Sequence, residues 1–235
     1  MPFLLAAACA LAVCACADTP APAAPELAAA PPSAPAPLVE VAPAPAAPDD
    51  DRRDVRALFA RYRAVASAGD GAGAAALVDG STVAYYQAAL VRARTASRAD
   101  LAGLPLIDRL VVLSIRHRIA SEVLVGLDGR SLVAAGVAGG WIGSQGTAHM
   151  ELGEVILNGD IAEAPVLVDG RPAEFSFRFR REPLGWRLDL NSVHPATEQA
   201  LAAAIAESRM PADSFMVAAL AQATGRPVGV EVWGR

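Results

Sequence analysis

Near residue 148 the spacing of the apolar side chains changes from one suited to helices to one suited to strands. In the N-terminal part they recur three and four positions apart, as in Val55, Phe59 and Tyr62, which places them on one face of a helix. In the C-terminal part they alternate with polar residues, as in Phe175 and Phe177, which places them on one face of a strand. The sequence therefore predicts an α+β fold: a helical N-terminal half packed on a curved four-stranded antiparallel meander, with further helices at the C-terminus.

Tight-turn sequences mark the boundaries of the strands. Asn158-Gly159-Asp160 and Asp169-Gly170 are typical of short hairpins, and Pro183-Leu184-Gly185 is typical of a longer one. A glycine at Leu152-Gly153 indicates a β-bulge that curves the first strand. The aromatic face of the sheet needs an apolar cover, which the preceding helices would provide. Four consecutive strands are expected, at residues 148–157, 161–168, 172–181 and 186–192.

Helix signals surround the sheet. The first helix begins at the aspartates from Asp49 and ends near Gly69. An Ala-rich turn at 72–78 and a second long helix, with its N-cap in Asp79-Gly80-Ser81-Thr82, come next. Pro105 suits the start of a helix that runs to about 118 and is apolar around most of its circumference, so we expect it to be buried centrally. Further helices are expected at 121–127, 130–138, 195–209 and 212–224, and the tail at 228–232 is expected to be a short strand or an extended segment held by Trp233.

The N-terminus has the features of an export signal. Its apolar run, residues 3–13, is shorter than the about 20 residues that cross a bilayer and matches the apolar region of a signal peptide. All three cysteines, Cys9, Cys14 and Cys16, lie in this region, so the folded part can hold neither a disulfide nor a cysteine metal site.

The cysteine cluster resembles a bacterial lipoprotein signal. In Leu11-Ala12-Val13-Cys14-Ala15-Cys16, Cys16 has the small residue expected before a lipidated cysteine, whereas Cys14 follows a bulky valine. The resemblance implies lipidation at Cys16 and a periplasm-facing location in the bacterial cell envelope, with the membrane as partner through the anchor. The alternatives are an ordinary signal cleaved near Ala17 and an uncleaved Ala-rich segment.

An Ala/Pro-rich segment separates this signal from the folded part. Of the 30 residues at 19–48, 22 are Ala or Pro, a composition that offers little apolar surface to bury and favours an extended, disordered tether. The domain organisation predicted is a signal at 1–17, a tether at 18–48, an α+β domain at 49–195 and a C-terminal helical extension at 196–235.

The charge balance excludes one class of partner. The net charge is −5, every basic residue is Arg, and no long basic run occurs. Nucleic-acid binders need a concentrated cationic face, so we expect no nucleic-acid partner.

Two segments carry a resemblance to a known fold family. They are residues 54–77, with the helix end Ala68-Gly69-Asp70, and residues 175–190, which contain Phe-Arg-Phe-Arg-Arg-Glu and Gly-Trp-Arg-Leu-Asp-Leu. Together they resemble the nuclear transport factor 2-like superfamily, which includes ketosteroid isomerase and polyketide cyclases. The likeness covers about 50–195 and departs from the family pattern at 98–143, where extra helices stand, and after 195. It implies a cone whose concave sheet face and helices enclose a pocket, either open or filled with side chains.

The ketosteroid isomerase pattern implies a general base with hydrogen-bond donors in a dry pocket. Tyr85 and Tyr86 are the candidate donors, and Asp108, His117 or His149 the candidate base. Each has a structural interpretation as well: Tyr86 lies on an apolar stripe, and His117 ends a helix, where a positive charge is favourable. His194 is interpreted as a turn residue. The candidate pocket is Tyr85, Tyr86, Asp108, His117, Trp141 and His149, with no catalytic residue assigned.

Other sites are not indicated by the motifs. The three histidines have no HxH or HxxxH spacing, no GxSxG occurs, and Gly139-Gly140 is not followed by a phosphate-loop lysine. We therefore expect no metal and no cofactor, and interpret Asp108-Arg109, and Arg178 and Arg180 beside Asp189, as ion pairs. The first hypothesis is a noncatalytic domain that binds a protein partner or a small apolar ligand. The second is a small acid–base enzyme, and the third a structural spacer.

Overall fold

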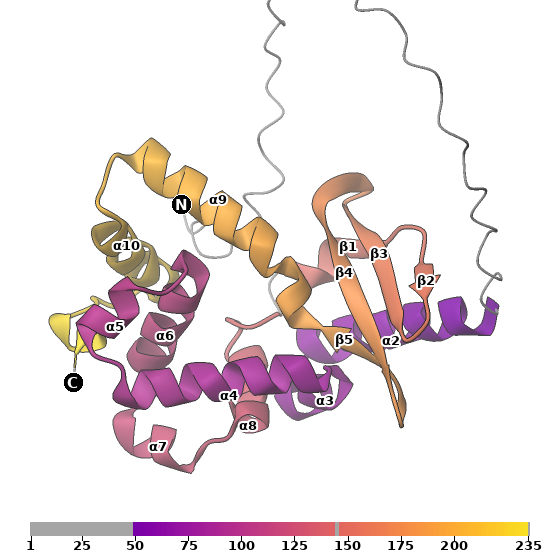
Figure 1. Cartoon of the computed structure of the whole chain (residues 1–235), viewed down its shortest axis with the longest axis horizontal. Helices are drawn as coiled ribbons and strands as arrows, with labels where there is room; N and C mark the ends of the chain where they lie inside the picture. Colours follow the sequence, from indigo (N-terminus) through magenta and orange to yellow (C-terminus); the bar gives the residue numbers. More distant parts are fainter. Residues whose placement is uncertain (1–48, 144–145, 235) are drawn as a thin grey trace, which may run out of the picture.

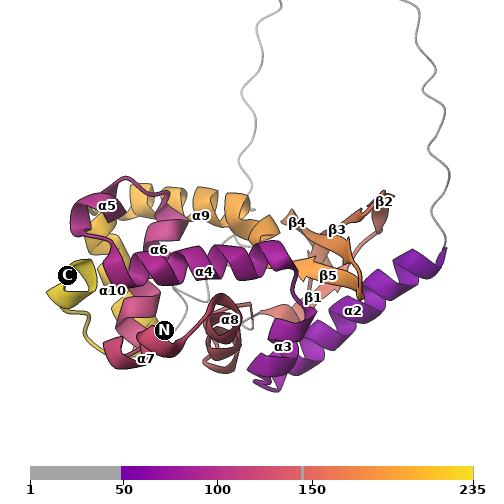
Figure 2. The same ribbon diagram turned by 60° about the horizontal axis from the view of Figure 1, so that its bottom comes forward.

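The computed structural model describes residues 49–143 and 146–234 and has the α+β architecture expected (Figure 1). The molecule is elongated, and its two ends differ. One end, called here the sheet lobe, contains helix α2 (Asp49–Ser67) and the antiparallel sheet of residues 150–189. The other, the helical lobe, contains the helices of residues 71–138 and 194–224 and the C-terminal tail, a separation also visible in Figure 2. The signal, Cys16 and the tether lie outside the described residues.

Helix α2 covers the inner face of the sheet. Three aspartates stand in its first turn, where the helix dipole favours negative charge. The ring of Phe59 lies 5.2 Å from that of Phe177 and 6.4 Å from that of Phe179. Both contacts join the middle of the helix to strand β4 (Arg171–Glu182), so large aromatic rings fill the space between helix and sheet. The buried stripe of the helix is Val55, Leu58, Phe59, Tyr62 and Ala66.

The sheet is the expected meander. Strands β1 (Met150–Leu152) and β2 (Ile156–Asn158) both pair with β3 (Ile161–Val168), which pairs with β4, and β4 pairs with β5 (Gly185–Asp189), all antiparallel. Asp169 (φ 49) and Gly170 (φ 78) both adopt the left-handed conformation that a two-residue hairpin turn requires.

The strand expected at 148–157 is two short strands. The amide of Gly153 donates to the carbonyl of Pro165 over 2.8 Å, and the chain then leaves the ladder until Ile156. An irregularity at Leu152-Gly153 was expected, but the break in the strand is longer than a single β-bulge. Arginines of α2 bind the carbonyls freed there. Arg56 donates to Leu152 and Gly153 over 3.0 and 2.7 Å, and Arg52 to Val155 over 3.2 Å.

The last strand ends at Asp189, three residues before the expected boundary. The Asp189 carboxylate accepts a hydrogen bond from the amide of Asn191 and starts the 3₁₀ turn η3 (Leu190–Val193). An aspartate that bonds a backbone amide two residues ahead favours a turn over a continued strand.

The long helices of the helical lobe agree in number and order with those predicted from the sequence. Residues expected as an Ala-rich turn instead form a helix, which Asp70 caps by accepting from the amide of Gly73. The next helix is capped by Asp79, and its first helical residue is Gly80. The helices are α3 (Gly71–Leu77), α4 (Gly80–Thr95), α5 (Arg98–Ala102), α6 (Leu106–Arg118), α7 (Ser121–Gly126), α8 (Gly129–Ala138), α9 (His194–Ser208) and α10 (Ala212–Thr224).

Helix α6 is the central helix, as expected. Val112, Leu113 and Ile115 are completely buried. Its N-terminus follows Pro105, which offers no side-chain cap, and Glu198 of α9 takes that place by accepting from the amides of Leu106 and Ile107 over 2.9 and 2.7 Å. Carboxylates are stabilising at a helix N-terminus, so this contact ties α9 to α6.

The tail is held as expected but is not a strand. Val230–Trp233 is a 3₁₀ turn, η4, with Val232 and Trp233 buried. Arg98 lies over the Trp233 ring, 5.0 Å from its centroid, and Arg116 donates to the carbonyl of Val232 over 3.1 Å. The tail lies in the helical lobe, away from the sheet (Figure 1), so no strand of the described residues lies next to it and could pair with it.

Candidate functional site

Two adjacent tyrosines of α4 face different surroundings. Tyr86 is buried in the core, and Tyr85 is half-buried. Their rings meet edge to face with centroids 5.2 Å apart, a favourable aromatic geometry. The interpretation of Tyr86 as a core residue is therefore consistent with its position, and Tyr85 is the tyrosine that partly reaches the surface.

Tyr85 and Asp108 come together as the sequence suggested. The Tyr85 hydroxyl donates to Asp108 Oδ1 over 2.7 Å, and Asp108 stands in the first turn of α6. Burial, followed by this hydrogen bond and the charge of Asp108, raises the pKa of Tyr85 well above its usual range. The hydroxyl therefore stays protonated at neutral pH and serves as a fixed hydrogen-bond donor to Asp108. Asp108 does not form the expected ion pair with Arg109, which instead pairs with Asp213 over 3.1 Å.

His194 joins this pair and was missed as a site residue. It is the first residue of α9, not a turn residue, because the following Pro195 occupies the start of the helix. Its ring lies 4.6 Å from that of Tyr85, tilted by 57°. Burial lowers the pKa of His194, against the opposing charge of Asp108, so the imidazole is neutral at neutral pH. The His-Pro dipeptide before an apolar helix is the signal that would have placed it there.

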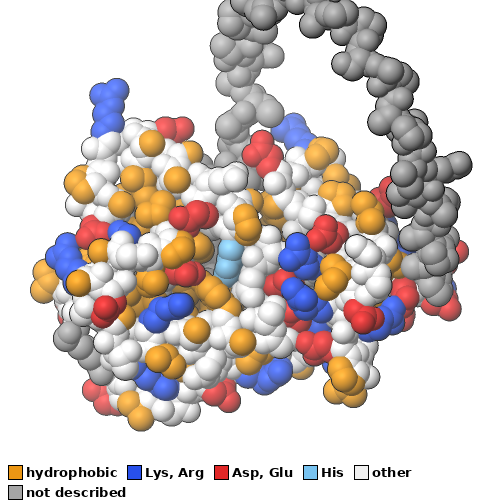
Figure 3. Space-filling model, in the orientation of Figure 1, with side chains coloured by type: hydrophobic (Ala, Val, Ile, Leu, Met, Phe, Trp, Pro, Cys, Tyr) orange, Lys and Arg blue, Asp and Glu red, His pale blue; other side chains and the backbone are white. Residues whose placement is uncertain are grey.

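Tyr85, Asp108 and His194 are called here the tyrosine cluster. Its members come from α4, α6 and α9, three helices that lie beside one another in the helical lobe (Figure 1). In the same orientation, Figure 3 shows a histidine side chain at the surface in the middle of this face, with hydrophobic side chains beside it. The cluster offers a neutral imidazole, an aromatic surface and a carboxylate close together, which suits either ligand binding or proton transfer.

The other three candidate residues lie apart from the tyrosine cluster. His117 Nε2 is 3.0 Å from Thr224 Oγ1 of α10, Trp141 stacks under Arg118 with 5.7 Å from guanidinium to ring centroid, and His149 pairs with Asp169 over 3.0 Å on an exposed turn. None of these contacts involves Tyr85 or Asp108, so the six candidates do not form one pocket.

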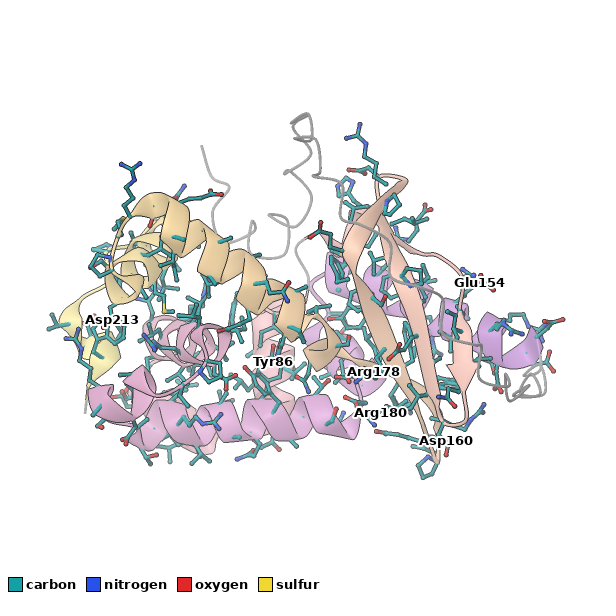
Figure 4. All side chains as sticks on the ribbon, turned by 45° about the horizontal axis from the view of Figure 1, so that its top comes forward. Tyr86, Glu154, Asp160, Arg178, Arg180 and Asp213 are labelled. Carbon is teal, nitrogen blue, oxygen red and sulfur yellow. The ribbon has the colours of Figure 1, made fainter. Side chains whose placement is uncertain are left out.

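A second polar group, at the seam between the lobes, contains the expected pair of Arg180 with Asp189 and adds Asp79, which was not predicted as a partner. Asp79 is completely buried, and its carboxylate accepts from the amide of Thr82 over 2.8 Å and from the hydroxyl of Ser81 over 2.6 Å. Arg180 Nε lies 3.2 Å from Asp79 and 4.0 Å from Asp189. Figure 4 shows Arg178 and Arg180 on β4 across the seam from Tyr86. These contacts join the N-terminus of α4 to the outer face of the sheet.

The two buried carboxylates share one guanidinium, and this affects Asp189. Burial, then the neighbouring charge of Asp79, raises the pKa of Asp189. Arg178, the other arginine expected beside Asp189, is paired with Glu163 over 2.9 Å. The two carboxylates are buried, whereas the Arg180 side chain is 41% exposed. We interpret the shared contact as a link that fixes the position of α4 relative to the sheet.

The described residues contain no group of three or more His, Cys, Asp or Glu side chains placed to hold a metal ion. Within the same residues, no helix is long and apolar enough to cross a membrane.

No protein-family model, curated protein or solved structure matches this chain. The resemblance to nuclear transport factor 2-like domains therefore stays a proposal, and function is argued from the residues of the site.

Proposed function

We propose that the protein is an exported, lipid-anchored protein of the bacterial cell envelope, whose nuclear transport factor 2-like domain binds an apolar ligand or a protein partner without catalysing a reaction. Lipidation would be at Cys16, with the Ala/Pro-rich tether holding the domain away from the membrane. The apolar run, the cysteine cluster and the tether composition support the export and anchoring parts of the proposal.

The filled inner face of the sheet supports a noncatalytic role. The family resemblance implies a substrate pocket between the concave sheet face and the helices. Here Phe59 of α2 contacts Phe177 and Phe179 at that place, and Phe179 is completely buried. Because side chains occupy the space that a substrate would need, binding is expected at the surface instead.

The tyrosine cluster is the surface that best suits such binding. Tyr85 and His194 are half-buried, and their contacting rings offer an apolar surface with few conformations to lose on binding. Tyr85 is already bonded to Asp108, so a ligand gains contact area there without having to break a hydrogen bond to water.

Anchoring is tested by exchanging one cysteine. Cys16→Ser is expected to release the protein from the membrane fraction and to remove the lipid mass from its N-terminus. Cys14→Ser is the matched control and is expected to stay in the membrane. If Cys16→Ser remains in the membrane, lipidation at Cys16 is refuted. Release of Cys14→Ser would then place the anchor at Cys14, and retention of both variants would refute anchoring through a cysteine lipid at either position.

Binding is tested with the neutral apolar dye Nile red. The wild-type protein is expected to increase the dye's fluorescence, and His194→Glu is expected to weaken dye binding about tenfold by placing a charge on the ring surface. His149→Glu, a change of the same kind at an exposed position of the 3₁₀ turn Thr147–His149, is the control and is expected to bind as the wild type does. Equal binding by all three proteins would move the binding surface away from the tyrosine cluster.

An acid–base enzyme of isomerase or cyclase type is the alternative, favoured by the contact of a neutral His194 with a hydrogen-bonded Tyr85. In that role His194 would take a proton from carbon and Tyr85 would help to orient the substrate. The test is exchange of deuterium from D₂O into the α-carbon of a panel of ketones, followed by nuclear magnetic resonance. Exchange by the wild type that His194→Gln abolishes would support the enzyme, and the absence of exchange would support the binding module.

A further inference from the structure

Two neighbouring arginines at the C-terminal end of α6 differ in how their guanidinium groups are bonded. Arg116 donates to four backbone carbonyls, those of Arg92, Ala93, Ala96 and Val232. Arg118, two residues later, has a buried Nε without a hydrogen-bond partner among the described residues, and its guanidinium lies over the Trp141 ring. The same helix end thus holds one satisfied and one unsatisfied arginine.

The helix dipole does not account for this difference. A cation in the last turn of a helix is stabilised by the helix dipole, and this applies to both arginines. A buried Nε–H group without a hydrogen bond loses its water contacts without replacing them, which is unfavourable. Contact with an aromatic ring offsets part of that cost, but it leaves the Nε–H group in the plane of the guanidinium unpaired.

The surroundings of Arg118 are positively charged. Arg226, which follows α10, donates to the carbonyl of His117 over 3.3 Å, and neither Arg118 nor Arg226 forms an ion pair with a carboxylate of the described residues. Burial and then the charge of Arg226 lower the pKa of Arg118. Burial, Arg226 and Arg118 lower the pKa of His117, and only Glu231 opposes them. An excess of positive charge is therefore concentrated at this end of α6.

We propose that Arg118 and Arg226 bind an oxyanion, a phosphate or carboxylate group of a ligand, against the edge of Trp141. An arginine fork pairs such groups through two parallel hydrogen bonds, and Trp141, already in contact with Arg118, holds the guanidinium in place. This site is separate from the tyrosine cluster, and it does not depend on the function proposed above.

The test uses inorganic phosphate as the probe, with the full chain and sodium chloride at matched ionic strength as the reference. Phosphate is expected to raise the melting temperature of the wild type and to give a saturable calorimetric titration. Arg118→Gln is expected to abolish the titration and Arg226→Gln to weaken it about tenfold. Arg61→Gln removes the same charge from an exposed position on α2 and is expected to titrate as the wild type does.

The melting temperature without phosphate shows whether Arg118→Gln is still folded. Without phosphate, Arg118→Gln is expected to melt at or above the wild-type temperature, because it removes an unsatisfied half-buried cation. Flotation with phosphatidylcholine vesicles that contain phosphatidylglycerol distinguishes a lipid headgroup from a free oxyanion as the source of the ligand. The proposal is overturned if the wild type neither responds to phosphate nor binds these vesicles, or if Arg118→Gln binds either as well as the wild type does.

Discussion

The packing inside the sheet lobe differs from the packing inside the helical lobe. In the sheet lobe, large aromatic rings fill the space between α2 and the strands, as Phe59, Phe177 and Phe179 do. In the helical lobe, α3 and α8 approach so closely that a side chain on Gly71 would overlap the carbonyl oxygen of Ala134. The sheet lobe should therefore be sensitive to the removal of atoms, and the helical lobe to their addition.

The largest effect is expected from Phe179→Ala in the sheet lobe. Phe179 is completely buried, and replacing a buried Phe by Ala costs about 3–5 kcal/mol in the free energy of unfolding, because it removes apolar contacts and leaves a cavity. Phe175→Ala, at a half-buried position of the same strand, should cost less. Equal losses in urea denaturation would show that the aromatic layer is not the core of this lobe.

The opposite change is expected to destabilise the helical lobe. Gly71→Ala places a methyl group on the Ala134 carbonyl, which should cost about 1–3 kcal/mol. Gly126→Ala is the matched control, because nothing lies within 4 Å of its added methyl group, and it should be neutral or slightly stabilising. Thermal unfolding of the two variants measures the difference, and a neutral Gly71→Ala would disprove the close α3–α8 contact.

A smaller loss of stability is expected when the contact of Glu198 of α9 with the N-terminus of α6 is weakened. Glu198→Gln removes the charge that accepts from the amides of Leu106 and Ile107, and losses of helix caps are about 1 kcal/mol. Glu207→Gln, on an exposed position of the same helix, should change the free energy of unfolding little. If both variants lose the same amount, the effect belongs to α9 and not to the N-terminus of α6.

The smallest effect is a dependence on pH that belongs to the helical lobe. Burial lowers the pKa of His194 and of His117 below the ordinary value of 6.5. The unfolded chain therefore takes up protons first, so the free energy of unfolding should fall as the pH drops from 6.5 toward the lowered values. His194→Gln should reduce this slope without abolishing it, because His117 contributes with the same sign. Urea denaturation at several pH values measures the slope, and an unchanged slope would contradict the burial of His194.

The sequence predicted best what depends on neighbouring residues. The hairpins at 158–160 and 169–170 and the position of the central helix all follow from local spacing and turn chemistry. It predicted strand ends less well. Strand β5 ends at Asp189, whose carboxylate accepts from the amide of Asn191, and the chain leaves the sheet after Gly153, whose amide still donates to Pro165 of β3. No alternation pattern contains these contacts.

The candidate site was predicted in part, for a related reason. Tyr85 and Asp108 meet because α4 and α6 cross at that point, and both were chosen from their residue type. His194 was missed because its partner is 109 positions earlier in the chain. The pair of Arg180 with Asp189 was expected, because the two residues lie on neighbouring strands. The contact of Arg180 with Asp79 was missed, because it joins a strand to a helix cap far away in the sequence.

The sequence by itself determined that the chain is helical first and then forms an antiparallel meander, because apolar periodicity and turn residues act within a few positions of each other. Only the tertiary structure decided the surroundings of the charged side chains. Asp79 is buried, Arg180 lies between two carboxylates, and the Nε of Arg118 has no hydrogen-bond partner among the described residues. Long-range contacts set the burial of a charge, and burial sets the free energy of its ionised form. A local pattern of residues therefore cannot predict that free energy.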